Sequence, residues 1–343
     1  PGFTITTEVC NYFMEHAELP DSLEKDIKRS VQKLEEYSGK QFGGDGTPLL
    51  LSVRSGGKIS MPGMMDSILN IGLNDDNVGK LADTFDDERF ALDSYRRLIQ
   101  MYSNVVLGLE HDRFEAVIAN KKRMDNVVSD ADFNVDQLNW IIDAFKNTVE
   151  RFSKAPFPQD PQEQLLGAVE AVFASWLNDR AVTYRKINNI PDAWGTGATV
   201  QTMVFGNLNE KSGTGVAFSR NPSNGEKELY GEYLMNAQGE DVVAGIRTPL
   251  PLNKKVATDG NSLEANHPDA FKEIKDISDK LETHFKDVQD IEFTIENEKI
   301  FLLQTRKAKR TAQASVKIAI DMVNEGVISK EEGLLMVDAN NIT

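Results

Sequence analysis

Residues 290–306 read DIEFTIENEKIFLLQTR, and this stretch decides the fold of the second half of the chain. Apolar and polar residues alternate on both sides of residues 296–298, which predicts two strands joined by a three-residue turn. Such a turn would place Asp290 opposite Gln304. The strand period of two then gives a polar face with Asp290, Glu292, Gln304 and Arg306, accompanied by Ile300 and Leu302. The core-facing set would be Ile291, Phe293, Phe301 and Leu303.

The polar face of this hairpin has the residue types of a metal and phosphate site. Two carboxylates, an amide oxygen and a guanidinium suit Mg²⁺ with phosphate, because Mg²⁺ takes hard oxygen ligands and shares them with substrate phosphates. The alternative is a solvated charged face with an ordinary salt bridge. Ile300 and Leu302 on the same face argue against full solvation.

A second constellation is SVRSGGKISMPGMMD at residues 52–66. The apolar run 49–53 predicts a buried strand that delivers Arg54 into a loop with three glycines. Glycines let backbone N–H groups approach an anion closely, and a guanidinium fits phosphate geometry. Lys58 could add a donor. The alternative is a surface turn whose arginine pairs with a carboxylate, since the spacing is not that of a P-loop.

The third constellation is QGEDVVAG at residues 238–245. Its paired acids, Glu240 and Asp241, follow a glycine turn and could hold ribose hydroxyls or a metal. On this segment alone a charged turn is the simpler interpretation.

Hydrophobic periodicity outlines the remaining organisation. Residues 2–7 predict a strand, and residues 8–18 and 23–37 predict helices. Residues 74–159 predict a helical subdomain that ends at two prolines, followed by a helix at 165–176. After residue 198 the pattern changes to strands at 199–205, 215–219 and 228–236. A polar loop at 253–268, a helix at 269–285 and two helices within 313–337 complete the prediction, with Ser329 as a cap.

Composition limits the class of protein. The 343 residues are 40% hydrophobic and 27% charged, which is typical of a globular chain, and the net charge of −16 disfavours nucleic acid as a partner. The single cysteine, Cys10, is interpreted as a small apolar filler, and the four histidines lack metal-ligand spacing. The apolar runs are too short to span a membrane, and the first residues do not resemble a signal segment, so we expect a cytoplasmic protein.

The ordered set of motifs resembles the pyruvate phosphate dikinase family. The matching segments are SVRSG (52–56), SMPGMMD (60–66), LND (73–75), DSYRR (93–97), QTMVFGN (201–207), SGTGVAFSRNP (212–222), GEY (231–233), NAQGEDVVAG (236–245), DIEF (290–293) and LQTR (303–306). They run in order over nearly the whole chain. The stretch at 61–66 favours this family over the related phosphoenolpyruvate synthases.

The resemblance implies an α+β, ATP-grasp fold with a helical insertion and a C-terminal helical segment. Residues 1–73 and 160–204 would form the first lobe, 74–159 the insert, 205–308 the second lobe, and 309–343 a helical linker toward a phosphohistidine domain. In the family, ATP, inorganic phosphate and pyruvate are interconverted with AMP, diphosphate and phosphoenolpyruvate. The β-phosphoryl of ATP passes through a histidine on a swivelling domain.

The resemblance also implies roles for individual residues. Arg54, Arg97 and Arg306 match arginines that bind and polarise phosphates. Glu292 and Gln304 match Mg²⁺ ligands, with Asp290 as an acidic neighbour. The matches near the nucleotide are Gly63 and Met65 in the loop over the triphosphate, Gln201, Met203 and Val204 beside adenine, and Glu240 and Asp241 near the ribose.

Two family segments have no counterpart in this sequence. A glycine-rich segment with a phosphate-binding lysine would precede Pro1, and the phosphohistidine motif and pyruvate domain would follow Thr343. We therefore expect the fragment to be monomeric and incomplete in the full reaction, and its parent to be a homodimer. The alternatives are a related dikinase, such as a phosphoenolpyruvate synthase, and a non-catalytic ATP-grasp interaction module.

Overall fold

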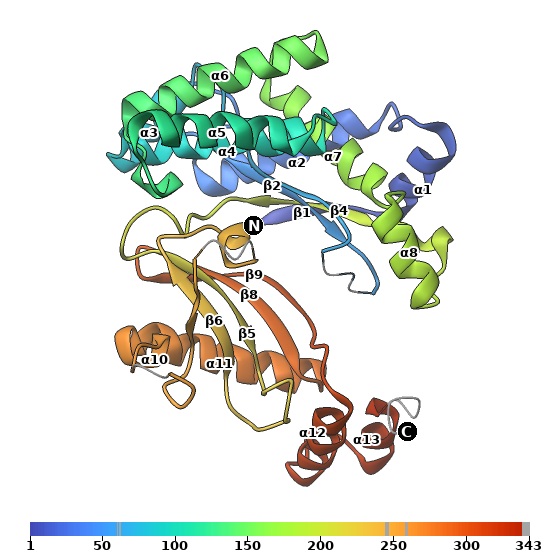
Figure 1. Ribbon diagram of the computed structural model, residues 1–343. Helices are drawn as coiled ribbons and strands as arrows, with labels where there is room; N and C mark the ends of the chain where they lie inside the picture. The colour runs from blue at the N-terminus through green and yellow to red at the C-terminus, as the bar shows by residue number, and fades with distance from the viewer. Residues whose placement is uncertain (60, 62, 244–246, 258–259, 338–343) are drawn as a thin grey trace. The chain divides into compact units, whose positions relative to one another are not determined.

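The computed structural model describes residues 1–59, 61, 63–243, 247–257 and 260–337 (Figure 1). The chain divides into two compact units, Pro1–Met203 and Val204–Thr343. Each unit combines helices with one antiparallel sheet, so the mixed α+β class predicted from the sequence is confirmed. In the described part of the chain, no helix has both the length and the apolar character needed to cross a membrane.

The first unit contains a four-stranded sheet and most of the helices. Its elements in chain order are β1 (Gly2–Ile5), α1 (Thr7–His16), α2 (Leu23–Ser38), β2 (Leu51–Gly56), β3 (Ser67–Ile71), α3 (Val78–Phe85), α4 (Glu88–Val105), α5 (His111–Asp125), η1 (Asp130–Asp132), α6 (Val135–Ser153), α7 (Pro161–Ser175), α8 (Asp179–Ile187), η2 (Asp192–Trp194) and β4 (Gly197–Thr202). The strand order is β1-β4-β2-β3, and all neighbours are antiparallel.

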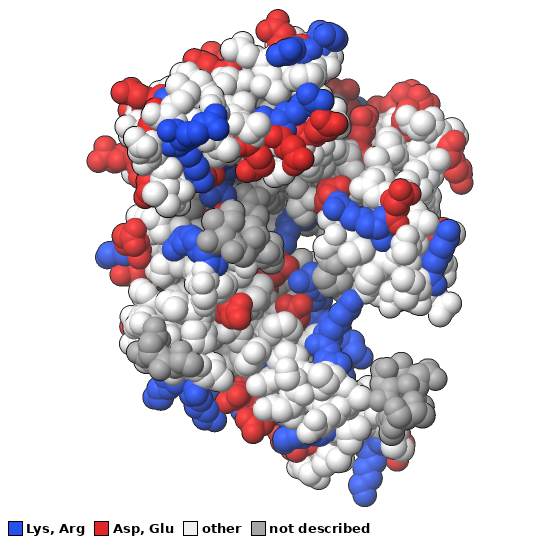
Figure 2. Space-filling model, in the orientation of Figure 1, with Lys and Arg blue, Asp and Glu red and all other residues white. Residues whose placement is uncertain are grey.

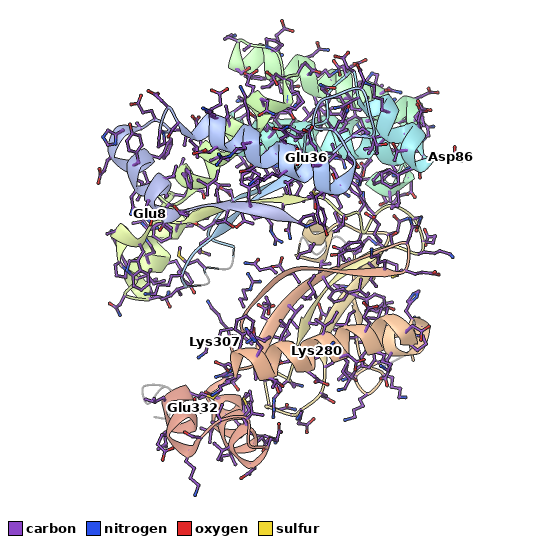
Figure 3. All side chains as sticks on the ribbon, turned by 180° about the vertical axis from the view of Figure 1, so that it is seen from behind. Glu8, Glu36, Asp86, Lys280, Lys307 and Glu332 are labelled. Carbon is purple, nitrogen blue, oxygen red and sulfur yellow. The ribbon has the colours of Figure 1, made fainter. Side chains whose placement is uncertain are left out.

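The helical region predicted at residues 74–159 is present as α3 to α6. In Figure 1 α4, α5 and α6 lie together on one side of the sheet, and both α4 and α7 contact strands of that sheet. Edge-to-face ring contacts fill the interior, for example Phe114 against Phe145 at 5.0 Å between centroids. On the face shown in Figure 2 acidic and basic side chains are interspersed over these helices. Seen from behind in Figure 3, Glu36 on α2 and Asp86 after α3 are exposed.

Proline acts at the end of this region as the sequence predicted, with one refinement. Asp160 caps α7 by accepting a hydrogen bond from the Gln162 backbone N–H at 2.8 Å, and Pro161 is the first helical residue. Proline suits that position because its missing N–H would have no helical partner there. The helix therefore begins four residues before the predicted start at Leu165.

The second unit contains a five-stranded sheet with strand order β7-β6-β5-β8-β9. Its elements are β5 (Gly213–Phe218), β6 (Tyr230–Met235), α9 (Gly239–Val243), β7 (Leu250–Pro251), α10 (Leu263–Asn266), α11 (Pro268–Phe285), β8 (Gln289–Glu296), β9 (Lys299–Lys307), α12 (Ala312–Asn324) and α13 (Lys330–Met336). Helix α11, with Lys280 labelled in Figure 3, packs on β8 and β9. Ile274 from α11 joins Ile291 and Phe293 in a buried core.

The predicted hairpin at residues 290–306 is confirmed, but the predicted register is wrong. Asn297 and Glu298 form a two-residue turn with φ values of 48° and 67°, the positive angles that a type I′ turn requires. The register then shifts between Glu292 and Phe293, which leaves Leu303 as an extra residue in β9. The shorter turn and the bulge each shift the pairing by one residue, so Asp290 lies opposite Arg306, not opposite Gln304.

The bulge also corrects the predicted faces of the hairpin. Ile300 pairs with Ile295 and lies in the core with Phe293, only 8% exposed, and so does not share the polar face. Beyond the bulge the alternation is restored, and the pairs Asp290–Arg306 and Glu292–Gln304 share one face as predicted. A one-residue irregularity of this kind leaves no trace in an alternation pattern.

Short elements account for most of the other differences from the sequence prediction. The region predicted as a loop at 253–268 contains α10, which begins after Ser262, whose hydroxyl accepts a bond from the Ala265 N–H at 3.2 Å. Four residues are too few to establish a helical periodicity. Ser329 does cap α13 as predicted, in a reciprocal capping box with Glu332.

Candidate functional site

In the first unit, Arg54 and Gln201 come from neighbouring strands of the sheet. Arg54 on β2 lies opposite Thr199 on β4, and Ser52 lies opposite Gln201, so these four side chains share one face. Val53 points to the other face and is fully buried. The alternation of β2 therefore places the arginine, partly buried, on the face away from the core of that unit.

The glycine-rich loop after β2 is held at its second half by α7 and α8. The carboxylate of Asp66 forms an ion pair with Arg180 and accepts a bond from Asn178 Nδ2 at 3.1 Å. Ser175 Oγ accepts from the Asp66 N–H at 3.4 Å and lies 3.8 Å from the Met65 sulfur. These contacts fix the position of Met65, one of the two residues expected over the triphosphate.

The other expected residue of this loop, Gly63, has φ 70°, and a Cβ built there meets nothing within 4 Å. Its requirement for glycine is therefore conformational, because other residues rarely adopt this angle. Lys58, which the sequence suggested as an extra phosphate donor, lies over the Trp194 ring at 4.6 Å from the centroid. Ser60 and Pro62 of the same loop lie outside the described residues.

Arg97 projects from α4 and is held by a carboxylate one turn earlier. Its Nε donates to Asp93 Oδ2 at 3.0 Å, and its side chain is 17% exposed. The other oxygen of Asp93 accepts from Arg96 Nε at 2.9 Å. Burial alone would raise the pKa of the Asp93 carboxyl, but the two arginines overcome this effect and hold the pKa well below its usual range.

The expected adenine-side residues fall at the end of β4. The Met203 N–H donates to the Leu50 carbonyl at 2.9 Å, which extends the pairing of β4 with the β2 segment by one residue. Val204 is the first residue of the second unit and is partly buried.

The expected ribose-side acids lie in the short helix α9. Asp241 accepts from the Gln238 N–H at 2.8 Å through Oδ2, so its carboxylate closes the turn that begins the helix. The side chain of Glu240 lies outside the described part of the structure, as do residues 244–246. The role expected for these two acids stays a prediction.

The second unit gathers four of the expected residues on one face of the β8–β9 hairpin. Arg306 donates from Nε to Asp290 Oδ2 at 2.9 Å and from Nη2 to Glu292 Oε1 at 3.0 Å. The arginine is 25% exposed and the two acids are 15% and 21% exposed. Gln304 pairs directly with Glu292 across the strands. This group is therefore charged, ordered by ion pairs and still accessible to a ligand.

The donors on this face fit Mg²⁺ bound together with a phosphate ligand. Glu292 and Gln304 offer one carboxylate and one amide oxygen as cross-strand neighbours. Among the described residues, His, Cys, Asp and Glu side chains form no group of three or more that could hold a metal ion. A magnesium ion at Glu292 and Gln304 would thus complete its shell with water and phosphate oxygens, which is its usual mode in nucleotide sites.

Sequence reasoning missed the residues that support these side chains. Asp93 stands four positions before Arg97 on a helix, a spacing that brings opposite charges together and could have identified the pair. Arg180, which holds Asp66, had no such signal because 114 residues separate the two. Contacts of this range depend on the fold and not on local spacing.

Nearly the whole chain matches known proteins of one family. A family model described as pyruvate phosphate dikinase, AMP/ATP-binding domain, matches residues 13–257 and 252–327. "Pyruvate, phosphate dikinase" of Rickettsia conorii is 52% identical over 342 residues, and that of Rhizobium meliloti is 50% identical over 343. A chloroplastic relative from Mesembryanthemum crystallinum is 45% identical over 343 residues.

These matches cover nearly all of this chain but a minor part of each relative. The matches cover 99% of this chain for the Rickettsia relative, 98% for the Rhizobium relative and 100% for the plant relative. They include 38% of each bacterial relative and 35% of the plant relative. The chain therefore spans little more than a third of the length of these proteins.

Proposed function

The chain belongs to the pyruvate phosphate dikinase family and carries its AMP/ATP-binding domain, and on this premise we propose that it binds Mg-ATP and phosphate for a phosphotransfer reaction. The observation that carries the proposal is the ordered face of the β8–β9 hairpin. There, one guanidinium and three oxygen-bearing side chains lie together, opposite the buried core. Catalysis of phosphoryl transfer depends on positioning and charge neutralisation, for which these groups are suited.

The fold that we propose is an ATP-grasp arrangement with a helical insert. Residues 1–73 with 160–204 form one lobe, 74–159 the insert, 205–308 the other lobe and 309–343 a helical linker. The antiparallel sheet in each unit and the helices α3 to α6 between β3 and α7 support this division.

The proposed phosphate contacts are Arg54, Arg97 and Arg306. A guanidinium can bind two phosphate oxygens at once, and it stays charged at every accessible pH. Glu292 and Gln304 would hold Mg²⁺, which neutralises phosphate charge when bound, and Asp290 would keep Arg306 in place beside it. The ion pair of Arg306 with both acids supports this assignment, because it fixes the arginine near the metal ligands.

The proposed nucleoside contacts come from three segments. Gln201, Met203 and Val204 would lie beside adenine, and Glu240 and Asp241 near the ribose. Gly63 and Met65 would cover the triphosphate. The left-handed conformation of Gly63 and the anchoring of Asp66 support a loop of defined shape.

The reaction that we propose for the complete protein starts with attack of a histidine on a swivelling domain at the β-phosphorus of ATP, which releases AMP and leaves a pyrophosphoryl-histidine. Inorganic phosphate then accepts the terminal phosphoryl group, which gives diphosphate and leaves a phosphohistidine. The histidine then phosphorylates pyruvate to phosphoenolpyruvate. We further propose a cytoplasmic homodimer for the complete protein and a monomer for the isolated chain.

The experiment supplies the complete protein with ATP, Mg²⁺, phosphate and pyruvate and measures diphosphate and phosphoenolpyruvate. The proposal predicts both products, with diphosphate formation dependent on added phosphate. Release of phosphate in place of diphosphate would instead identify a phosphoenolpyruvate synthase. If no turnover and no ATP binding occur, the chain is a non-catalytic interaction module.

A binding measurement tests the nucleotide site itself. Arg54→Ala should weaken Mg-ATP binding in calorimetry by about 30- to 150-fold, since a lost charged phosphate contact costs about 2–3 kcal/mol. Unchanged affinity in this variant would remove Arg54 from the site.

A further inference from the structure

We propose that Asp93 is a positioning residue that sets Arg97 for phosphate binding, an inference that rests on the function proposed above. None of the roles assigned so far includes Asp93. The carboxylate is only 9% exposed, and each of its two oxygens binds one arginine. It acts on the phosphate through Arg97 and does not touch the phosphate itself.

The geometry holds Arg97 at its inner nitrogen. Asp93 Oδ2 accepts from Arg97 Nε at 3.0 Å, one helical turn away on α4. A bond at Nε fixes the direction of the whole guanidinium plane. Arginine side chains otherwise lose rotamer freedom when a ligand binds, and a fixed side chain reduces that cost.

Arg96 fixes Asp93 in turn. Its Nε and Nη2 both lie within 2.9 Å of Asp93 Oδ1, and its side chain is 4% exposed. Its Nη1 donates to Gln100 Oε1 at 3.0 Å, and Gln100 Nε2 donates to Glu115 on α5 at 2.6 Å. The carboxylate is thereby tied to the helical insert on one side and to the phosphate arginine on the other.

Charge balance gives Asp93 a second effect on Arg97. Two neighbouring guanidiniums at this degree of burial repel each other, and the carboxylate of Asp93, which contacts both, reduces that repulsion. Removal of the carboxylate charge would let the arginines move apart. We therefore expect the loss of Asp93 to displace Arg97 and not merely to weaken one helix.

The test is a double-mutant cycle of Asp93→Asn and Arg97→Ala in the complete protein, with Mg-ATP affinity, kcat and thermal unfolding measured for each variant. Asp93→Asn should lower nucleotide affinity or kcat by about 10- to 100-fold, because small displacements of a positioned group have effects of this size. In the Arg97→Ala background, the same change should lower neither value further.

Two variants separate positioning from stability. Arg96→Met removes the partner of the other oxygen but leaves the bond of Asp93 to Arg97, so it should lower nucleotide affinity less than Asp93→Asn does. Adding Asp93→Asn to Arg96→Met keeps the buried charges balanced, so folding is preserved, and should still weaken nucleotide binding.

The matched control is Asp125→Asn on α5. Asp125 is also a partly buried carboxylate with two partners, Lys121 at 2.9 Å and Gln137 at 2.7 Å. The Asp125→Asn substitution should change thermal stability and leave Mg-ATP affinity and kcat unchanged.

The outcomes distinguish this inference from the function on which it rests. Equal losses for Asp93→Asn with and without Arg97, or a loss of stability alone, would overturn the positioning role and leave the nucleotide site intact. No effect of Arg97→Ala on Mg-ATP binding would overturn both. A loss of nucleotide affinity or kcat on Asp93→Asn that occurs only in protein that retains Arg97 would confirm the inference.

Discussion

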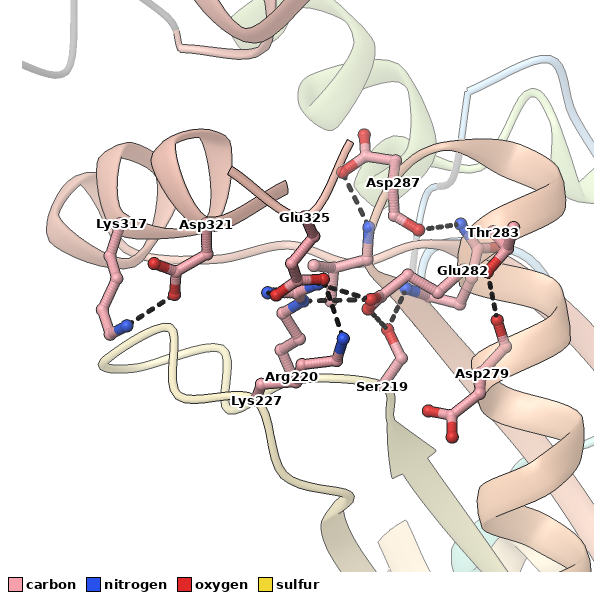
Figure 4. A network of polar contacts seen from close by, with 12 residues as sticks. Ser219, Arg220, Lys227, Asp279, Glu282, Thr283, Asp287, Lys317, Asp321 and Glu325 are labelled. Carbon is pink, nitrogen blue, oxygen red and sulfur yellow. Dashed lines mark hydrogen bonds and ion pairs between the residues drawn. The ribbon is translucent and has the colours of Figure 1, made fainter. Parts of the chain in front are cut away.

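At two places in the second unit, an arginine bridges two carboxylates, and the two places differ in how deeply the arginine is buried. Arg220, after β5, binds Glu282 of α11 and Glu325 at the end of α12 with distances of 2.8–3.1 Å (Figure 4). Arg306 binds Asp290 and Glu292 on the sheet face at 2.9 and 3.0 Å. The bonds are alike, but Arg220 is fully buried and Arg306 is a quarter exposed.

The difference in burial separates the ion pair that supports the fold from the one that a ligand can reach. Around Arg220, Ser219 donates to Glu282 at 2.6 Å and Lys227 donates to Glu325 at 2.7 Å, so each acid has a further partner. Burial would lower the pKa of Arg220, but the two glutamates raise it further above its usual value. This closed network attaches α12 to α11. The Arg306 group lies on an accessible strand pair, where phosphate can compete for the guanidinium.

Glu282→Ala should produce the largest effect, since it breaks the buried network on one side. Removal of one partner from a buried ion pair costs about 3–5 kcal/mol of unfolding free energy. Urea unfolding of the chain measures this loss. Asp279→Ala on the same helix, in an exposed pair with Lys275, is the control and should cost less than about 0.5 kcal/mol. Similar losses in both variants would contradict the structural role of Arg220.

Arg306→Ala should show the opposite pattern. Its partly exposed ion pairs contribute within about 1 kcal/mol to stability after solvent screening. Nucleotide binding should weaken by about 2–3 kcal/mol, because a charged phosphate contact is lost. Calorimetry with Mg-ATP and urea unfolding of the same sample give the two values. A large loss of stability with unchanged binding would make the two arginines equivalent and refute the comparison.

The Arg306 group could be predicted in part from the sequence, and the reasons for the rest are physical. The alternation at residues 290–306 predicted the shared face of Asp290, Glu292, Gln304 and Arg306. It could not predict the register, because the two-residue turn and the bulge at Leu303 depend on backbone angles.

The Arg220 network had no sequence signal. Its two glutamates are 62 and 105 residues from the arginine, and only the fold brings them together. Asp93 was detectable by helical spacing, yet the positioning role proposed for it rests on the bond to Arg97 Nε. Local patterns thus predict elements and faces, whereas long-range ion pairs require the tertiary structure.

Cys10 provides the smallest expected effect and a check that Arg306→Ala keeps the fold of the first unit. The thiol is fully buried, and burial raises its pKa above the ordinary value. At pH 8 it should stay protonated and react slowly with a maleimide, and the rate should rise on unfolding. Wild type and Arg306→Ala should label equally slowly. Rapid labelling of the folded wild type would contradict the buried position of Cys10.

We propose that the β8–β9 face holds Mg²⁺ together with the phosphates of a nucleotide. The test is calorimetric titration of the complete protein with ATP, with and without Mg²⁺, in which wild type is compared with Glu292→Gln. We predict that Mg²⁺ strengthens ATP binding in the wild type, and that this gain is largely lost when the carboxylate becomes an amide. An equal gain in both proteins would contradict the claim.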